Sequence, residues 1–477
     1  MSATPAAPAA TTPRGSRVHV LDGIRGIALV LVLLHHAWIL TPTSDITARP
    51  LRVLVTSGDY AVTAFLVVSG FLAMRAVLNT EARTGAVHFG VITLRRWARL
   101  AGQVYVLLAA VAITTAVLPG MAPGSAPNDP QGMDAQNTGM SLWRILTFTW
   151  PSYVIDHPME ARSDLGHLWY VSADLWGVAA MALLAFFFAR RRAVLGLALV
   201  GAIALCTIYR FHMVSSGQEW DALLSLPARV DGLFWGALAA VAVPWLESLR
   251  GKLTGVAPLL LVGLVAVMWF GNGPVNYLQM GGLTFNLLFT ALVLTTALGG
   301  ATGMLGQVLG HPVLAWLGTM SLAVYLWHYP VWFYIARNHL DWEWPFEDRF
   351  GWPWSAQLAL GLAVTAALAM LSVRLVERPL QVKMTSPWWR NLDHGLVVLL
   401  GDRSRQIAGR VSDRVGAATA QARNKPAPAP RAEEAHQEPG DPAREEAPVA
   451  ARVDPEADSP DEPADDTLPV APEPPTT

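Results

Sequence analysis

Arg25 and His36 are the residues of this sequence whose types and spacing point most directly to chemistry. They lie in one apolar stretch that opens with Leu-Asp-Gly-Ile-Arg-Gly at residues 21–26 and ends at His35 and His36. Eleven helical residues turn through about three full revolutions and rise about 16 Å, so Arg25 and His36 share one helix face. An imidazole can act as a general base near neutral pH, and a guanidinium binds phosphate groups by paired hydrogen bonds.

The same helix offers two further groups. His35 points about 80° away from the shared face, toward a neighbouring helix or lipid. Asp22 stands one turn before Arg25 and could orient its guanidinium. Titratable groups inside a bilayer cost free energy and usually serve a function. The alternative for His36 is a structural role, as a core histidine that is hydrogen-bonded to another helix.

The composition indicates a membrane setting. The chain has 477 residues, of which 53% are hydrophobic and 15% charged, with a mean hydropathy of +0.35. A soluble protein carries about 25% charged residues. The single cysteine, Cys206, excludes an internal disulfide framework and a cysteine metal cluster. We expect no bound metal, no permanent cofactor and no nucleic-acid partner.

Ten apolar stretches are long enough to cross a bilayer as helices, which takes about 20 residues each. They lie at 20–40, 53–74, 100–118, 166–189, 193–209, 229–246, 254–270, 282–299, 312–336 and 355–376. The sequence therefore predicts an all-α fold, a polytopic membrane bundle of about ten transmembrane helices. It shows no internal repeat of a transporter type, which weakly disfavours a transporter.

Basic residues accumulate on one side of this predicted bundle. They are Arg14, Arg17, Arg75, Arg83, Arg95, Arg96, Arg99, Arg190, Arg191, Arg192, Arg250, Lys252, Arg378, Lys383 and Arg390. Basic loops mark the cytosolic side, and an even number of helices returns the chain to the side from which it started. We therefore expect a multi-pass protein of the plasma membrane with both termini in the cytosol.

The ends of the chain differ from its middle. Residues 1–17 are expected to be a disordered tail without a cleavable signal peptide, and 18–382 form the membrane domain. Residues 383–421 should be an interfacial segment or linker. Residues 422–477 are rich in Pro, Ala and Glu and lack the apolar residues of a core, so they should form a disordered cytosolic tail that could recruit a protein partner.

Six motifs follow one another along the chain. They are the Arg25–His36 helix, FLVVSGFL at 65–72, RRWARL at 95–100, HLWYVSADL at 167–175, SLAVYLWHYP at 321–330 and ERP at 377–379. In order and spacing these motifs resemble the acyltransferase-3 family of integral membrane O-acyltransferases. Two positions depart from the family pattern, because Gly102 replaces a proline and Asp174 replaces a common glutamate. The proline is associated with a local bend, which Gly102 puts in doubt.

The resemblance implies transfer of an acyl group, with acetyl expected, from cytosolic acyl-CoA to a hydroxyl of a carbohydrate, glycolipid or cell-envelope glycan. Acyl-CoA would be a co-substrate held by Arg25, Arg96 and Arg99, although the arginines at 96 and 99 could equally serve topology. His36, with Arg25, would be catalytic, either as a general base or as the carrier of the acyl group. The hydrolase-like outer domain of some relatives is not expected here, so a second transfer step would need a partner.

Five further residues are candidates to bind or orient substrate. They are Asp22, Ser69, Trp169, Asp174 and His328. Packing alone could explain Ser69. Asp174 is expected on the outer half of its helix with His167, where it could bond an acceptor, hold a histidine or pair with Arg229. His328 precedes a proline that should kink its helix and could line the same cavity as His36.

Three other functions stay open on the sequence alone. A glycosyltransferase with a polyprenyl-linked donor would need a carboxylate in the first outer loop, where only Asp45 is found, beside Arg49 and Arg52. A proton-coupled transporter or flippase could use His36 as a proton relay. A non-catalytic scaffold would depend on the tail at 422–477.

Overall fold

The fold is taken from a computed structural model of the chain. It describes residues 19–40, 48–118, 137–271, 273–337 and 354–384, and a few positions between 386 and 417. Within these residues all regular secondary structure is helical, which confirms the predicted all-α fold. The expected tails at 1–17 and 422–477, and nearly all of the segment 383–421, lie outside the described residues, so the proposed division of the chain stays a prediction.

Eight helical segments of the described chain are long and apolar enough to span a membrane. They are α1 (His19–Ile39), α3 (Gly58–Thr84), α4 (Phe89–Val117), η2 with α7 (Ser163–Phe188), α8 (Arg192–Ser215), α11 with η3 (Asp231–Leu249), α13 to α14 (Pro274–Ala297) and the stretch Leu358–Met384 of α17 to α18. Within these spans the α-helices have the bounds Trp169–Phe188 for α7, Asp231–Ala242 for α11, Gly282–Ala297 for α14, Trp354–Ser372 for α17 and Arg378–Met384 for α18. A ninth forms if α15 (Gly303–Leu309) and α16 (Pro312–Arg337), which are bent by 43°, count as one span. With the shorter apolar helix α12 (Val256–Phe270), these match the ten stretches predicted from the sequence.

The remaining described helices are short and lie between the spans. They are α2 (Arg49–Thr56), α5 (Thr138–Leu146), α6 (Trp150–Asp156), α9 (Glu219–Leu224) and α10 (Leu226–Arg229). The segment α5 to η2 follows α4 in the chain and includes a fully buried pair, Arg162 and Asp164, with 2.7 Å between Nη2 and Oδ2.

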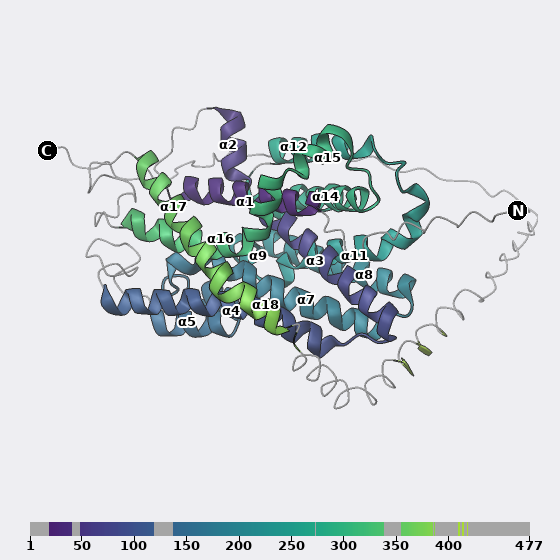
Figure 1. Ribbon diagram of the computed structural model, residues 1–477, viewed down its shortest axis with the longest axis horizontal. Coiled ribbons are helices and arrows are strands. Elements are labelled where there is room, and N and C mark those ends of the chain that lie inside the picture. Colours follow the sequence, from purple (N-terminus) through teal and green to yellow (C-terminus); the bar gives the residue numbers. More distant parts are fainter. Residues whose placement is uncertain are drawn as a thin grey trace, which may run out of the picture. The chain divides into compact units, whose positions relative to one another are not determined.

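The helices α1 and α16 pack along each other (Figure 1). Glycines allow their backbones to touch: a Cβ atom on Gly318 would lie 1.8 Å from the carbonyl oxygen of Asp22, and one on Gly26 would lie 2.3 Å from that of Leu314. Since Gly26 meets Leu314 near the start of both helices and His36 meets His328 farther along, the pair is parallel. These contacts at Gly26 and Gly318 form a glycine seam between the two helices. The glycine seam fixes the position along α16 that each polar residue of α1 faces.

The central helix of the described bundle is α3, which packs against α1, α7, α11 and α14. A Cβ atom on Gly70 would lie 2.0 Å from the carbonyl oxygen of Leu233, so this glycine is required for close packing with α11. The helix α4 continues without a break through Gly102, although the family pattern places a proline there. Both helices therefore present their polar residues from rigid, continuous segments.

Candidate active site

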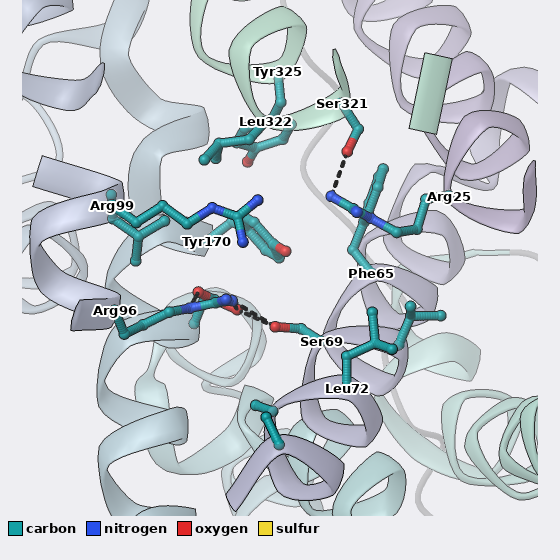
Figure 2. Close-up of a pocket in the computed structure, with 15 residues that line it drawn as sticks. Arg25, Phe65, Ser69, Leu72, Arg96, Arg99, Tyr170, Ser321, Leu322 and Tyr325 are labelled. Carbon is teal, nitrogen blue, oxygen red and sulfur yellow. Dashed lines mark hydrogen bonds and ion pairs between the residues drawn. The ribbon is translucent and has the colours of Figure 1, made fainter. Parts of the chain in front are cut away.

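A cavity of about 290 Å³ lies where α1, α3, α4, α7 and α16 meet (Figure 2). Its lining residues are Arg25, Phe65, Val68, Ser69, Leu72, Ala73, Ala76, Arg96, Arg99, Leu100, Tyr170, Asp174, Ser321, Leu322 and Tyr325. The lining contains three arginines and one aspartate, and two further carboxylates, Asp22 and Glu377, lie within 4 Å of Arg25 and Arg99 outside the lining. The lining itself, in which arginines outnumber the aspartate, is suited to an anionic ligand with an apolar portion.

Arg96 is held firmly in this wall by two side chains from other helices. Its Nε atom donates to Oδ2 of Asp174 at 2.6 Å, and its Nη2 atom donates both to Oδ1 of Asp174 and to Oγ of Ser69, the latter at 2.5 Å. Ser69 also donates to Asp174 at 2.7 Å. Because Asp174 is nearly fully buried, this bidentate pair joins α4, α7 and α3 as a fixed unit.

The sequence left the partner of Asp174 open between an acceptor, a histidine and Arg229, and the structure gives Asp174 a different partner. It pairs with Arg96 rather than with Arg229, whose Nη2 atom lies 3.3 Å from Asp59. The partner was hidden from the sequence because the rotation of α7 against α4 is decided by packing.

Arg25 and Arg99 reach into the cavity from opposite sides (Figure 2). The Nη2 atom of Arg25 donates to Oγ of Ser321 at 2.8 Å, and its Nη1 atom lies 3.7 Å from Oδ1 of Asp22. Asp22 thus stands beside Arg25 as predicted. Arg99 is the most exposed of the three arginines, with 36% of its side chain accessible, and its guanidinium is 3.6 Å from Glu377.

The role of Glu377 was not found from the sequence, although the ERP motif contains it. This buried carboxylate also accepts a hydrogen bond of 2.8 Å from the side-chain amide of Gln103. It thereby connects η5 (Val373–Glu377) to α4 beside Arg99. An acidic residue at the end of an apolar stretch was the available signal, but its partner Gln103 lies 274 positions away in the chain.

His36 lies in the last turn of α1 and does not line the cavity. Its Nδ1 atom is 2.7 Å from Nε2 of His328, and Nδ1 of His328 is 2.7 Å from the carbonyl oxygen of Tyr325. The rings of Tyr329 and His167 flank His36, with centroids at 4.9 and 6.5 Å. His35 faces away from this group and contacts the carbonyl oxygen of Val55 at 2.7 Å, as its expected direction implied.

The hydrogen bonds fix the tautomers of the two imidazoles in their neutral forms. A carbonyl oxygen can only accept, so Nδ1 of His328 donates to Tyr325 and Nε2 of His328 must accept. Nδ1 of His36 therefore donates to His328, which leaves the lone pair of His36 on Nε2. Among the described residues, none forms a hydrogen bond with this Nε2 atom.

Tyr325 stands between the cavity and the histidines. Its ring lines the cavity with that of Tyr170, 5.2 Å away, and it also lies 5.3 Å from the His167 ring and 5.6 Å from the His328 ring. Arg25 and His36 thus both face α16, as their spacing predicted, but Tyr325 stands between the cavity that Arg25 lines and the ring of His36.

Most of the predicted site residues lie either at the cavity or in the histidine cluster. Ser69, Asp174 and the three arginines line the cavity, and His328 joins His36. Trp169 lies apart, with the guanidinium of Arg229 4.7 Å from the centre of its ring. In the described part of the chain, no group of three or more His, Cys, Asp or Glu residues is arranged to hold a metal ion.

Comparisons with known proteins agree with this architecture. The family described as "Acyltransferase domain" matches residues 18–374, and no solved structure matches the chain. The peptidoglycan O-acetyltransferase OatA of Listeria monocytogenes is 23% identical over 395 residues, which are 78% of this chain and 57% of that protein.

Two further relatives are similarly distant. A Bacillus subtilis protein named "Putative peptidoglycan O-acetyltransferase YrhL" is 24% identical over 76% of this chain and 55% of its own length. A Staphylococcus aureus (strain COL) protein named "Putative O-acetyltransferase" is 22% identical over 75% of this chain and 56% of its own length. The chain thus spans little more than half the length of these relatives. Because the family match covers most of the sequence, the chain belongs to the family described as "Acyltransferase domain".

Proposed function

We propose that this protein is a membrane O-acyltransferase that moves an acetyl group from acetyl-CoA to a hydroxyl of a cell-envelope glycan. The family membership and the names of the relatives support O-acetylation. The observation that carries the proposal is the arrangement of the site itself. An arginine-lined cavity lies on one side of Tyr325, and an imidazole whose Nε2 atom has no donor among the described residues belongs to the cluster on the other side.

The arginines are the proposed binding groups for the phosphates of the donor. Arg96 is bound to Asp174 and Ser69, so its main role would be to shape the cavity. Arg99 and Arg25 have weaker partners and supply the attraction for a phosphate. Basic residues gather near this end of the bundle, which by the positive-inside rule would be cytosolic, the side from which acyl-CoA arrives.

The histidine cluster is the proposed place of reaction. As the acceptor oxygen attacks the thioester carbonyl carbon, its proton passes to Nε2 of His36. The carbon–sulfur bond then breaks, and the coenzyme A thiolate takes the proton from His36. The products are an ester and free coenzyme A, and His36 returns to its neutral form ready for the next cycle.

The distance between the arginine-lined cavity and the histidine cluster suits an elongated donor such as acetyl-CoA. Arg25 and His36 are about 16 Å apart along α1. The acyl-bearing arm of coenzyme A would extend from the arginines past Tyr325 to the histidines, while the glycan would approach from the outer face. With both termini in the cytosol, as proposed here for a plasma-membrane protein, the reaction would connect a cytosolic donor to an external acceptor.

The test uses the full-length protein in lipid nanodiscs with radiolabelled acetyl-CoA and glycan strands isolated from cell walls. The wild type should release coenzyme A and label the glycan. His36→Ala should abolish labelling while the protein remains folded, since general-base catalysis is worth about 10²–10⁴-fold. His212→Ala, which changes an exposed histidine of α8, is the matched control and should leave the rate unchanged. Full activity in His36→Ala would overturn the mechanism.

A further inference from the structure

The histidine cluster contains a third imidazole, His167, which the mechanism above does not use. It lies in η2 (Ser163–Leu168) and is only 4% exposed. Its Nε2 atom is 3.2 Å from the carbonyl oxygen of Leu326, and its buried Nδ1 atom has no hydrogen-bond partner. Its ring lies 6.5 Å from that of His36 and 5.2 Å from that of Tyr329.

The available carbonyl of Leu326 is a consequence of the proline in α16. Pro330 has no N–H group, so the carbonyl four residues earlier, that of Leu326, loses the donor that a regular helix would provide. His167 fills this place by donating from Nε2. Neutral His167 therefore carries its proton on Nε2 and its lone pair on Nδ1. The Tyr325 carbonyl determines the tautomer of His328 in the same way, because a carbonyl oxygen can only accept a hydrogen bond.

The cluster thus contains two imidazoles whose acceptor nitrogens have no protein donor in the described chain. They are Nε2 of His36 and Nδ1 of His167. The buried Nδ1 atom of His167 has no partner, which is unfavourable, so a ligand that donates to it gains affinity. Two acceptor nitrogens in neighbouring rings suit a ligand that carries at least two O–H groups.

We infer that His167 is a substrate-binding residue whose Nδ1 atom accepts a hydrogen bond from a second hydroxyl of the acceptor, next to the hydroxyl that reacts at His36. This inference rests on the proposed function and names a residue that binds its polyhydroxylated acceptor. It also gives Pro330 a role. Because Pro330 has no N–H group, the Leu326 carbonyl accepts from Nε2 of His167, and the lone pair of His167 is therefore on Nδ1.

Two substitutions distinguish substrate binding by His167 from a purely structural role. Each of them retains only one of the two hydrogen-bonding functions of the imidazole. In His167→Gln, the side-chain amide can still donate to the Leu326 carbonyl, but nothing accepts at the position of Nδ1. In His167→Asn, an oxygen takes the place of Nδ1, but the side chain is too short to reach Leu326. Both are assayed in nanodiscs with acetyl-CoA and isolated glycan strands, and their thermal unfolding is measured.

The expected result is that His167→Gln raises KM for the glycan about tenfold and leaves KM for acetyl-CoA unchanged, while His167→Asn changes the glycan KM much less. The opposite order would show that His167 only holds α16, and an unchanged glycan KM in His167→Gln would equally overturn the inference. If the wild type itself transfers no acetyl group, the proposed function has failed as well.

Pro330→Ala provides a second route that leaves His167 in place. It returns an N–H group to position 330, which competes for the Leu326 carbonyl and frees His167 to exchange tautomers. The glycan KM should rise in this variant and the acetyl-CoA KM should not. An unchanged glycan KM in folded Pro330→Ala would count against the role assigned to the proline.

Discussion

His36 donates from Nδ1 to Nε2 of His328 over 2.7 Å, although 292 positions separate the two residues in the chain. This contact orients the imidazole ring of His36 and holds its lone pair on Nε2. His328 is therefore a positioning residue, which acts on the reaction through His36 rather than by touching the acyl group.

Substitution of His328 should lower kcat more than it changes either KM. We expect His328→Phe to reduce kcat roughly 10²-fold, since a misplaced base loses about that much. His328→Gln keeps an oxygen that accepts from His36 and should recover a large part of the rate. Steady-state kinetics with acetyl-CoA and glycan strands measure both variants, and equal losses in the two would contradict the orienting role.

Arg99 should recognise the phosphates of the donor rather than its acyl end. Arg99→Gln is expected to raise KM for acetyl-CoA about tenfold, which corresponds to one lost charge-assisted hydrogen bond. Acetyl-pantetheine carries the same thioester without phosphates, so its KM should be the same in wild type and variant. Arg83→Gln, at an exposed arginine of α3, serves as the control. If Arg99→Gln raised KM equally for acetyl-CoA and acetyl-pantetheine, Arg99 would not act by binding the phosphates.

The Arg96–Asp174 pair should contribute to stability as well as to the shape of the cavity. Asp174→Asn leaves the buried Arg96 without its counter-charge, and breaking a buried pair in this way costs about 3–5 kcal/mol. The thermal midpoint of unfolding in detergent should fall clearly. Glu247→Gln breaks the exposed pair with Arg250 and should leave the midpoint unchanged. Similar midpoints for the two variants would show that the buried pair is dispensable.

The glycine seam between α1 and α16 should be required for activity, although its glycines do not line the cavity. A Cβ atom on Gly318 would meet the backbone oxygen of Asp22 at 1.8 Å, so Gly318→Ala must push α1 away from α16. Both Arg25–Ser321 and His36–His328 would lengthen, and overpacking of this kind costs about 1–3 kcal/mol. Gly201→Ala, where nothing lies within 4 Å of the added atom, is the control. Normal turnover in Gly318→Ala would show that the seam tolerates movement.

Much of the fold could be read from the sequence. Apolar runs gave the membrane helices because their length is a one-dimensional property. The shared face of Arg25 and His36 followed from helical periodicity alone, and both residues do face α16. The six ordered motifs identified the family. In each case the information lies within one helix or in the linear order of the chain.

The contacts between helices required the tertiary structure. The sequence left the partner of Asp174 open, whereas packing of α7 against α4 joins it to Arg96. The sequence also did not show that Tyr325 stands between the cavity and the histidines. Its motifs included His167 and Pro330, but the hydrogen bond that links them through Leu326 was not apparent. The sequence by itself determined which polar groups enter the bundle and on which helix face. Only the tertiary structure decided their partners, because helix rotation and height depend on side-chain packing over the whole bundle.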